Sequence, residues 1–141
     1  MAPTFAVEET IDRPAGEVWD ALTDWSNAHR WMPGVDRMEA QGETAAGTEI
    51  RFHARNAERT SVIARCDAGR SIVLRSVQGG VTADYTYELH PAGDAATRVT
   101  LVAECRFRGL LLLIMSPLIR RAIRSADGVQ LERLKKVVEA D

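Results

Sequence analysis

Histidine is the side chain of this sequence best suited to act as a general base near neutral pH. There are three histidines. His29 lies in a polar helical segment and His90 adjoins a turn, while His53 alternates outward with Arg51 and Arg55 in a strand-like segment. No local pattern pairs any of them with a nucleophile, a second carboxylate or a metal-ligand set. We interpret all three as solvated residues, so the sequence identifies no catalytic residue and leaves open whether the protein is an enzyme.

The two cysteines, Cys66 and Cys105, stand alone in strand-like segments. A zinc site would show paired Cys or His residues at short spacing, and neither cysteine has such a neighbour. Both are predicted to be buried free thiols. We expect no metal and no cofactor.

Tyr85 and Tyr87 have the same parity in one alternating segment, so both side chains should lie on the same face of a strand. A buried tyrosine hydroxyl usually finds a hydrogen-bond partner. The hydroxyls could therefore face a ligand, or they could belong to ordinary core tyrosines whose partners are backbone groups.

Length and composition indicate one globular domain over residues 1–141, since the 141 residues are 45% hydrophobic and 27% charged. The formal charge of −2 gives no general attraction to nucleic acid or to anionic membranes, so any basic surface must be local. The longest apolar run, Leu110–Met115, ends at Ser116-Pro117, well short of the roughly 20 residues of a membrane span. The first residues lack the pattern of a signal peptide, and a cytoplasmic protein is expected.

The elements that must position these side chains are mainly strands. One strand is expected at Phe5–Ile11, followed by a short helix over Pro14–Thr23 and another over Trp25–Trp31. Turn residues then divide six further strands, predicted at Val35–Gln41, Gly47–Arg55, Arg59–Asp67, Ser71–Val77, Val81–His90 and Thr97–Phe107. Apolar residues alternate with polar ones in several of these strands, so one face of the sheet is dry and needs a covering layer.

The C-terminal stretch from Gly109 to Glu139 supplies that layer. Ser116-Pro117 is a natural start for a helix, so the main helix is predicted from Pro117, with Leu110–Met115 forming a preceding turn or short helix; one kinked helix is the alternative. An apolar stripe on this helix should face the sheet, and it comprises Leu118, Ile119, Ala122, Ile123, Ala126, Val129, Leu134 and Val137.

This order of elements resembles the START-related, or SRPBCC, superfamily. The resemblance covers essentially the whole chain and is carried by Ile11–Trp25, Trp31–Val35, Tyr87–Leu89 and Thr97–Leu101. It implies an α+β helix-grip fold, in which a curved seven-stranded antiparallel sheet and two short helices accompany a long C-terminal helix over the concave face. In that fold the strands of Cys66 and Cys105 would lie three steps of ~4.8 Å apart, too far for a disulfide.

The resemblance also implies a cavity, because similar proteins include polyketide cyclase/dehydrase-like proteins and lipid-transfer domains. Small residues in the middle of the predicted helix, such as Ala122, Ala126 and Gly128, would leave volume over the sheet. Alternatively, the aromatic residues of the strands collapse onto those small residues and close the space. The cavity candidates are Trp31, Phe52, Leu74, Tyr85, Tyr87, Leu101, Met115, Ile119, Ala122 and Ala126.

Three functions agree with this sequence. The first is binding or carriage of a small hydrophobic molecule, lipid-like or polyketide-like, in an internal cavity. The second is a cyclase/dehydratase-type enzyme, which would need polar groups converging inside the cavity. The third is an accessory module that docks on a protein partner, or on a second copy, through the short apolar run Leu110–Met115 or the outer face of the sheet.

An outward basic cluster bears on the third function. Arg51, His53, Arg55, Arg65 and Arg75 could together meet an acidic partner. A solvated sheet face balanced by acids on neighbouring strands is the alternative interpretation.

Overall fold

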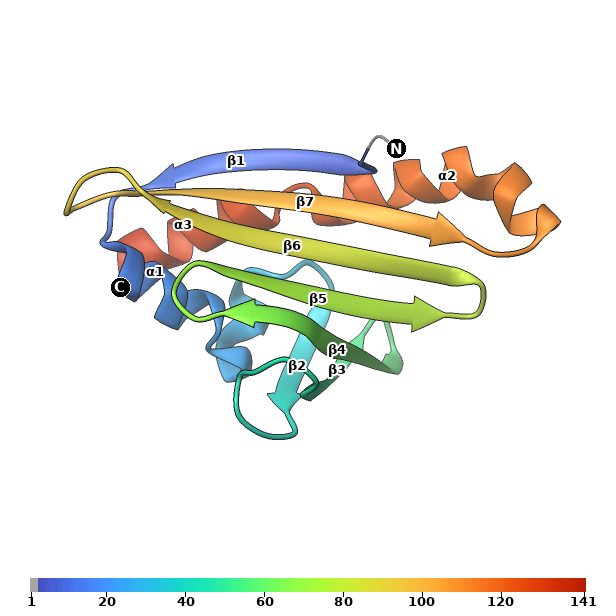
Figure 1. The fold of residues 1–141 in the computed structure, drawn as a ribbon, viewed down its shortest axis with the longest axis horizontal. Coiled ribbons are helices and arrows are strands. Elements are labelled where there is room, and N and C mark those ends of the chain that lie inside the picture. The colour runs from blue at the N-terminus through green and yellow to red at the C-terminus, as the bar shows by residue number, and fades with distance from the viewer. Residues whose placement is uncertain (1–2) are drawn as a thin grey trace.

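The alternating segments form one antiparallel sheet in the computed structural model, which describes residues 3–141 (Figure 1). Its seven strands lie in the order β1-β7-β6-β5-β4-β3-β2. Along the chain the elements are β1 Phe5–Ile11, α1 Ala15–Leu22, the 3₁₀ helix η1 Trp25–Arg30, β2 Val35–Ala40, β3 Glu49–Ala54, β4 Ala57–Asp67, β5 Ser71–Gln78, β6 Val81–Pro91, β7 Thr97–Phe107, α2 Leu110–Asp127 and α3 Gln130–Ala140. The predicted helix-grip architecture is confirmed, with strand ends that differ from the predicted ones by a few residues.

Strand pairing fixes which side chains share a face. The longest ladder joins β6 to β7, from Val81 opposite Phe107 to Pro91 opposite Thr97. The order of the strands places β4 and β7 three positions apart, and Cys66 and Cys105 are both free. This is the separation expected for the two thiols.

The hydrophobic core lies mainly under α1 and α3. Helix α3 contacts β1, β7, α1 and η1, and it buries Leu131, Leu134 and Val138. By contrast, Ser116 is the only buried residue among the eighteen of α2. The two halves of the C-terminal segment therefore cover the sheet differently, tightly along α3 and loosely along α2.

The break in the C-terminal segment lies at Gly128 and Val129, where α2 ends and α3 has not begun. The predicted helix start at Pro117 is wrong, because α2 runs from Leu110 through that proline. An interior proline removes the hydrogen bond to the carbonyl four residues earlier, here that of Leu113. Leu113 is 54% exposed, so water can take the place of the missing donor.

The predicted apolar stripe is wrong at two positions. Leu118 is 66% exposed and Ala122 is also exposed, whereas Ile119 and Ile123 turn toward the interior. The predicted stripe assumes a helix that packs on the sheet along its whole length, whereas the first half of α2 does not pack on it. Among the residues that the structure describes, no helix has both the length and the apolar character to cross a membrane.

Candidate functional site

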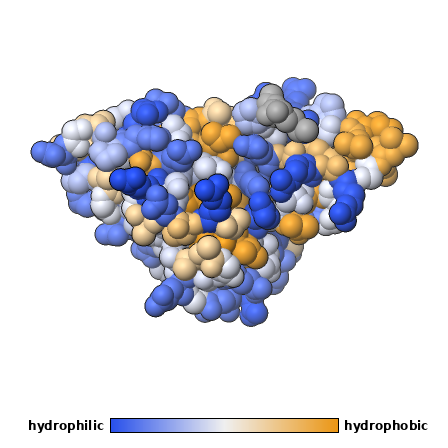
Figure 2. Space-filling model, viewed as in Figure 1, coloured by the Kyte–Doolittle hydropathy of each residue, from blue (hydrophilic) through white to orange (hydrophobic). Residues whose placement is uncertain are grey.

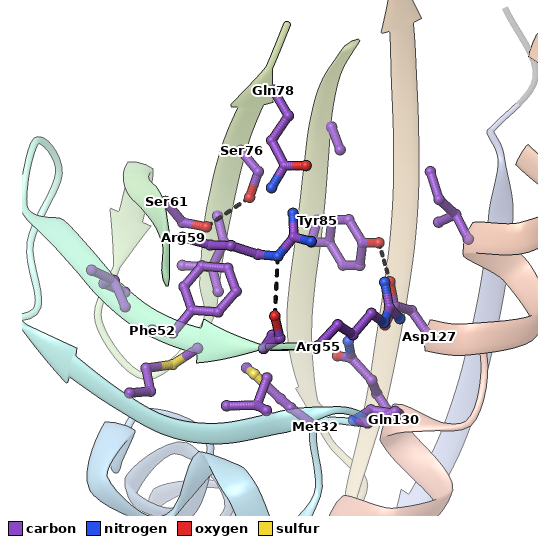
Figure 3. Close-up of a pocket in the computed structure, with 18 of the residues that line it drawn as sticks. Met32, Phe52, Arg55, Arg59, Ser61, Ser76, Gln78, Tyr85, Asp127 and Gln130 are labelled. Atoms are coloured by element: carbon purple, nitrogen blue, oxygen red, sulfur yellow. Dashed lines mark hydrogen bonds between the residues drawn. The ribbon is translucent and has the colours of Figure 1, made fainter. Parts of the chain in front are cut away.

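A cavity of about 340 Å³ lies between the inner face of β2–β6 and the end of α2 (Figure 3). Its volume is within the range of small-molecule sites. Tight packing under α3 and loose packing under α2 explain the position of the cavity, because the side chains that α2 turns toward the sheet do not fill the space between them. The inward parity of each strand decides which side chains line it.

Most of the wall is apolar. Phe52 and Ile50 come from alternate positions of β3, Leu74 from β5, and Ile119 and Ile123 from successive turns of α2. The other apolar lining residues are Met32, Pro33, Val35, Met38, Ala54, Val81 and Ala83. An apolar molecule placed here would exchange contact with water for contact with this wall, which is the main driving force for binding.

Polar side chains gather on the rest of the wall. They are Arg55, Arg59, Ser61, Ser76, Gln78, Tyr85, Asp127 and Gln130, with the hydroxyl of Tyr87 beside them. Arg59 and Ser61 share the inward parity of buried Ile63 on β4. Ser61 lies opposite Ser76 in the β4–β5 ladder, and their Oγ atoms are 2.7 Å apart.

Arg59 points into the cavity together with Phe52 and Tyr85 (Figure 3). Its Nε donates a hydrogen bond of 3.4 Å to the backbone oxygen of Ala54. Within residues 3–141, no acidic side chain lies within ion-pair distance of its guanidinium group. The remaining guanidinium N–H groups are therefore available to a bound molecule.

Arg55 reaches the cavity because of a tight turn. Arg55 and Asn56 both have positive φ, 52° and 62°, and they form the two-residue connection between β3 and β4. Such a pair is typical of a type I′ hairpin turn. The turn directs Arg55 past Gly34 to the cavity instead of to the outer face that strand parity predicted.

Two tyrosines of β6 connect the sheet to the junction of α2 and α3. Tyr85 Oη donates to Asp127 Oδ2 and Tyr87 Oη donates to Gln130 Oε1, both at 2.5 Å. Burial, and then the negative charge of Asp127, raise the pKa of Tyr85 above its ordinary value. Burial likewise raises the pKa of Tyr87, so both hydroxyls are protonated donors at neutral pH.

Five of the ten predicted cavity residues line this cavity, namely Phe52, Leu74, Tyr85, Tyr87 and Ile119. The structure places the other five elsewhere. Trp31 and Leu101 are almost completely buried in the packed core, where Trp31 meets Tyr87 edge to face at 6.1 Å between ring centroids. Met115, Ala122 and Ala126 belong to α2 but lie outside the lining, because α2 turns Ile119 and Ile123 toward the cavity instead.

Sequence reasoning missed the polar wall. Arg59, Ser61 and Ser76 could have been found, because each lies on the same face of its strand as a buried apolar residue, Ile63 or Leu74. No local signal marked Asp127, since its partner Tyr85 is 42 residues away in the sequence.

Three of the five residues of the predicted outward basic cluster are balanced by acids, Arg55 lines the cavity instead, and Arg65 has no ion pair within residues 3–141. Arg51 pairs with Glu49 at 2.8 Å and Arg75 pairs with Asp84 at 2.7 Å. His53 Nδ1 lies 2.8 Å from Asp36. No group of three or more His, Cys, Asp or Glu residues that could hold a metal ion occurs in the described part of the chain.

The cavity wall thus combines an apolar floor with two arginine side chains, two phenolic donors and one carboxylate. Guanidinium and phenol groups donate hydrogen bonds to carbonyl, carboxylate or phenolate oxygens. The arrangement suits a largely apolar molecule that carries oxygen atoms, because donors and apolar side chains are neighbours across the strands.

Comparison with known protein families finds one family whose model matches this chain. A family model described as "Polyketide cyclase / dehydrase and lipid transport" matches residues 2–139. No curated protein sequence matches the chain.

Solved structures share the fold at low sequence identity. The ZhuI aromatase/cyclase from a Streptomyces species superposes with a TM-score of 0.79 at 16% identity, covering 96% of this chain and 92% of that one. A protein from Thermus thermophilus gives 0.74 at 18% identity, covering 96% of both chains. Norcoclaurine synthase from Thalictrum flavum, in complex with dopamine and hydroxybenzaldehyde, gives 0.66 at 17% identity over 95% of this chain and 84% of that one.

Proposed function

Because the chain belongs to the polyketide cyclase / dehydrase and lipid transport family, we propose that it binds a small, largely apolar molecule in the cavity under α2. The molecule is lipid-like or polyketide-like and carries oxygen atoms that can accept hydrogen bonds. The supporting observation is the mixed wall, in which Arg59 lies beside Phe52 and Tyr85 beside Leu74 on the inner face of the sheet, with Ile123 of α2 in the same lining. Apolar contact supplies affinity, and the polar groups select orientation.

A second candidate is a cyclase or dehydratase activity on a poly-keto chain. Polar groups do converge inside, as that hypothesis requires. Tyr85 is a protonated donor, Asp127 is the carboxylate that accepts its hydrogen bond, and Arg59 is positioned to polarise a carbonyl oxygen. Turnover would need proton transfer between these groups and the substrate, whereas carriage needs only binding.

The first experiment is native mass spectrometry of gently purified protein, followed by release and identification of any bound molecule. A defined apolar adduct supports binding and names its chemical class. Absence of an adduct, together with no thermal stabilisation by a panel of lipids and aromatic polyketides, would contradict the proposal.

Ala83→Phe tests the place of binding. Ala83 lines the cavity from β6, so a phenyl ring there should occupy the volume and abolish the adduct. Thr82→Phe is the matched control, because Thr82 is the adjacent residue of β6 and its side chain has the opposite parity. An adduct that survives Ala83→Phe in a folded protein would place the binding site elsewhere.

Tyr85→Phe and Asp127→Asn separate the two functions. For a carrier, each variant should change affinity modestly and the released molecule should stay chemically the same. For an enzyme, a poly-keto substrate should turn over in the wild type, and each variant should reduce kcat by about a hundredfold or more while substrate still binds.

A further inference from the structure

The first half of α2 exposes a group of large apolar side chains at one end of the molecule. Six of them are between 40% and 75% exposed, and we call them the apolar tip: Leu110, Leu111, Leu113, Ile114, Met115 and Leu118. In Figure 1, α2 begins beyond the end of the sheet, and Figure 2 shows hydrophobic side chains gathered at that end. A contiguous exposed apolar patch usually marks an interaction site.

The tip is held firmly by the strands beside it. The backbone N–H of Arg108 donates to the Gly80 oxygen at 2.7 Å. A Cβ atom on Gly80 would lie only 2.6 Å from Leu112 Cδ1, so this leucine packs directly on the β5–β6 turn. Leu112 thus lies on the side of α2 that packs against the β5–β6 turn, and the exposed apolar residues lie on the sides of the helix that face solvent.

The exposed residues are spread widely around the helix. At 100° per residue, the six side chains cover about 200°, more than half of the circumference. A groove in a partner protein accepts a narrower stripe, whereas an apolar medium contacts a helix from several sides at once. Residues 110–118 rise only about 12 Å along the helix axis, too little to cross a bilayer, so this segment can contact only its surface region.

Positive charge accompanies the tip. Residues 105–126 contain five arginines, and the acidic residue Glu104 lies just before them. Arg120 and Arg124 donate to backbone carbonyls and Arg106 lies 3.6 Å from Asp84. Arg108 and Arg121 are exposed, and within residues 3–141 their side chains have no hydrogen-bond or ion-pair partner.

The charges of Arg108 and Arg121 indicate which kind of surface binds the apolar tip. Arg108 lies two residues before the first residue of α2, and Arg121 follows Leu118 by about one helical turn, so they flank the two ends of the tip. Two copies of the tip in contact would bring like charges together, whereas a negatively charged lipid surface complements them.

We propose that the apolar tip, with Arg108 and Arg121, docks on the surface of a bilayer that contains anionic lipid. The leucine, isoleucine and methionine side chains enter the boundary of the acyl chains, and the guanidinium groups contact lipid phosphates. This interaction goes beyond the proposed cavity binding and does not depend on which molecule the cavity holds. Ile119 of the cavity wall adjoins Leu118, so docking would bring the cavity close to the lipid.

The test is co-sedimentation of the intact protein with vesicles of phosphatidylcholine alone or mixed with phosphatidylglycerol. Binding should be stronger to the mixed vesicles and should weaken as salt is added. The double substitution Leu111→Ser with Ile114→Ser should weaken binding by about tenfold or more, because both apolar side chains enter the lipid. These residues are 70% and 68% exposed, so folding should be unaffected, which circular dichroism verifies.

Val62→Ser is the matched control, since Val62 is an exposed apolar residue of β4, and it should bind as the wild type does. Arg108→Gln with Arg121→Gln should remove the preference for phosphatidylglycerol. Equal binding to both vesicle types by the wild type, no binding at all, or full binding by the Leu111→Ser, Ile114→Ser protein would overturn the proposal. Dimerisation in sedimentation velocity that this variant abolishes, without vesicle binding, would assign the tip to a second copy instead.

Discussion

Tyr85 and Tyr87 occupy alternate positions of one strand, yet their hydroxyl groups have different surroundings. Tyr87 is 1% exposed and its acceptor Gln130 is 5% exposed, so both partners are removed from water. Tyr85 is only partly buried, and its acceptor Asp127 lines the cavity. Loss of the hydroxyl therefore leaves an almost completely buried amide oxygen without a donor in one case and a partly exposed carboxylate in the other.

Tyr87→Phe should consequently destabilise the protein more than Tyr85→Phe. Leaving the buried amide oxygen of Gln130 without a donor should cost about 1–3 kcal/mol, whereas water can take the place of the Tyr85 hydroxyl at the partly exposed Asp127 carboxylate and so reduce the cost there. Urea unfolding of the two variants measures the difference. Equal costs, or a larger cost for Tyr85→Phe, would mean that water does not reach Asp127.

The raised pKa values of the two tyrosines predict a loss of stability in alkali. The folded state holds both phenolic protons above the pH at which the unfolded chain releases them, so folding stability is unaffected below the ordinary tyrosine pKa of about 10 and falls as pH rises above it. The chain has only these two tyrosines, so tyrosinate absorbance reports on them alone. Tyrosinate should form in the folded protein only above the ordinary pKa.

The variant carrying both Tyr85→Phe and Tyr87→Phe is the control for this experiment. Its free energy of unfolding should fall less steeply with pH above about 10, because two linked protons are missing. A wild-type titration with an ordinary tyrosine pKa would contradict the burial that the structure assigns to both rings.

At the scale of elements, the strands and the helical character of the C-terminal segment followed from the sequence, whereas the position of the break between α2 and α3 did not. Alternation in segments such as Val81–His90 and Thr97–Phe107 reports burial directly, and those strands lie within one residue of the predicted ends. Ser116-Pro117 is a good local signal for a helix start, but packing of Leu112 on Gly80 holds the preceding residues in the same helix. That contact joins distant segments, so no local pattern contains it.

The close packing of Gly80 against the start of α2 leads to a prediction about a substitution in the β5–β6 turn. A Cβ atom there would lie 2.4 Å from the backbone oxygen of Arg108, so Gly80→Ala must displace either the turn or the start of α2. We expect a loss of about 1–3 kcal/mol in the free energy of unfolding, as for other overpacked sites.

Gly16→Ala is the matched control in the same experiment. Gly16 lies in α1, and a Cβ atom there would meet nothing within 4 Å. Alanine favours a helix over glycine by up to about 1 kcal/mol, so this variant should be as stable as the wild type or more stable. If Gly80→Ala were equally harmless, the turn and helix would not be in contact in solution.

At the scale of the whole molecule, the cavity results from unequal cover over one sheet. Parity predicted its apolar side, through Phe52 and Leu74, because those residues share a strand face with buried apolar neighbours. Its polar side depends on the turn at Arg55 and on Asp127 at the far end of α2. Asp127 meets Tyr85 only when distant parts of the chain come together, and Arg55 leaves the outer face because of the positive-φ conformation of its turn, so strand parity could report neither.

A ligand of the cavity should stabilise the entire fold, because it binds the folded chain and not the unfolded one. At about a hundredfold excess over Kd the expected gain is about 2.7 kcal/mol. Anilinonaphthalene sulfonate is a suitable probe, since its apolar rings fit the wall at Phe52 and its sulfonate can meet Arg59. The urea midpoint of the wild type should therefore rise with probe concentration.

Two variants locate that effect. The rise should persist in the Leu111→Ser, Ile114→Ser protein, whose exposed tip is altered, and it should vanish in Ala83→Phe, whose cavity is filled. The opposite pattern would assign probe binding to the apolar tip and leave the cavity without a demonstrated ligand. Because one measurement responds differently to the two variants, it tells the interior site apart from the exposed surface within the same folded molecule.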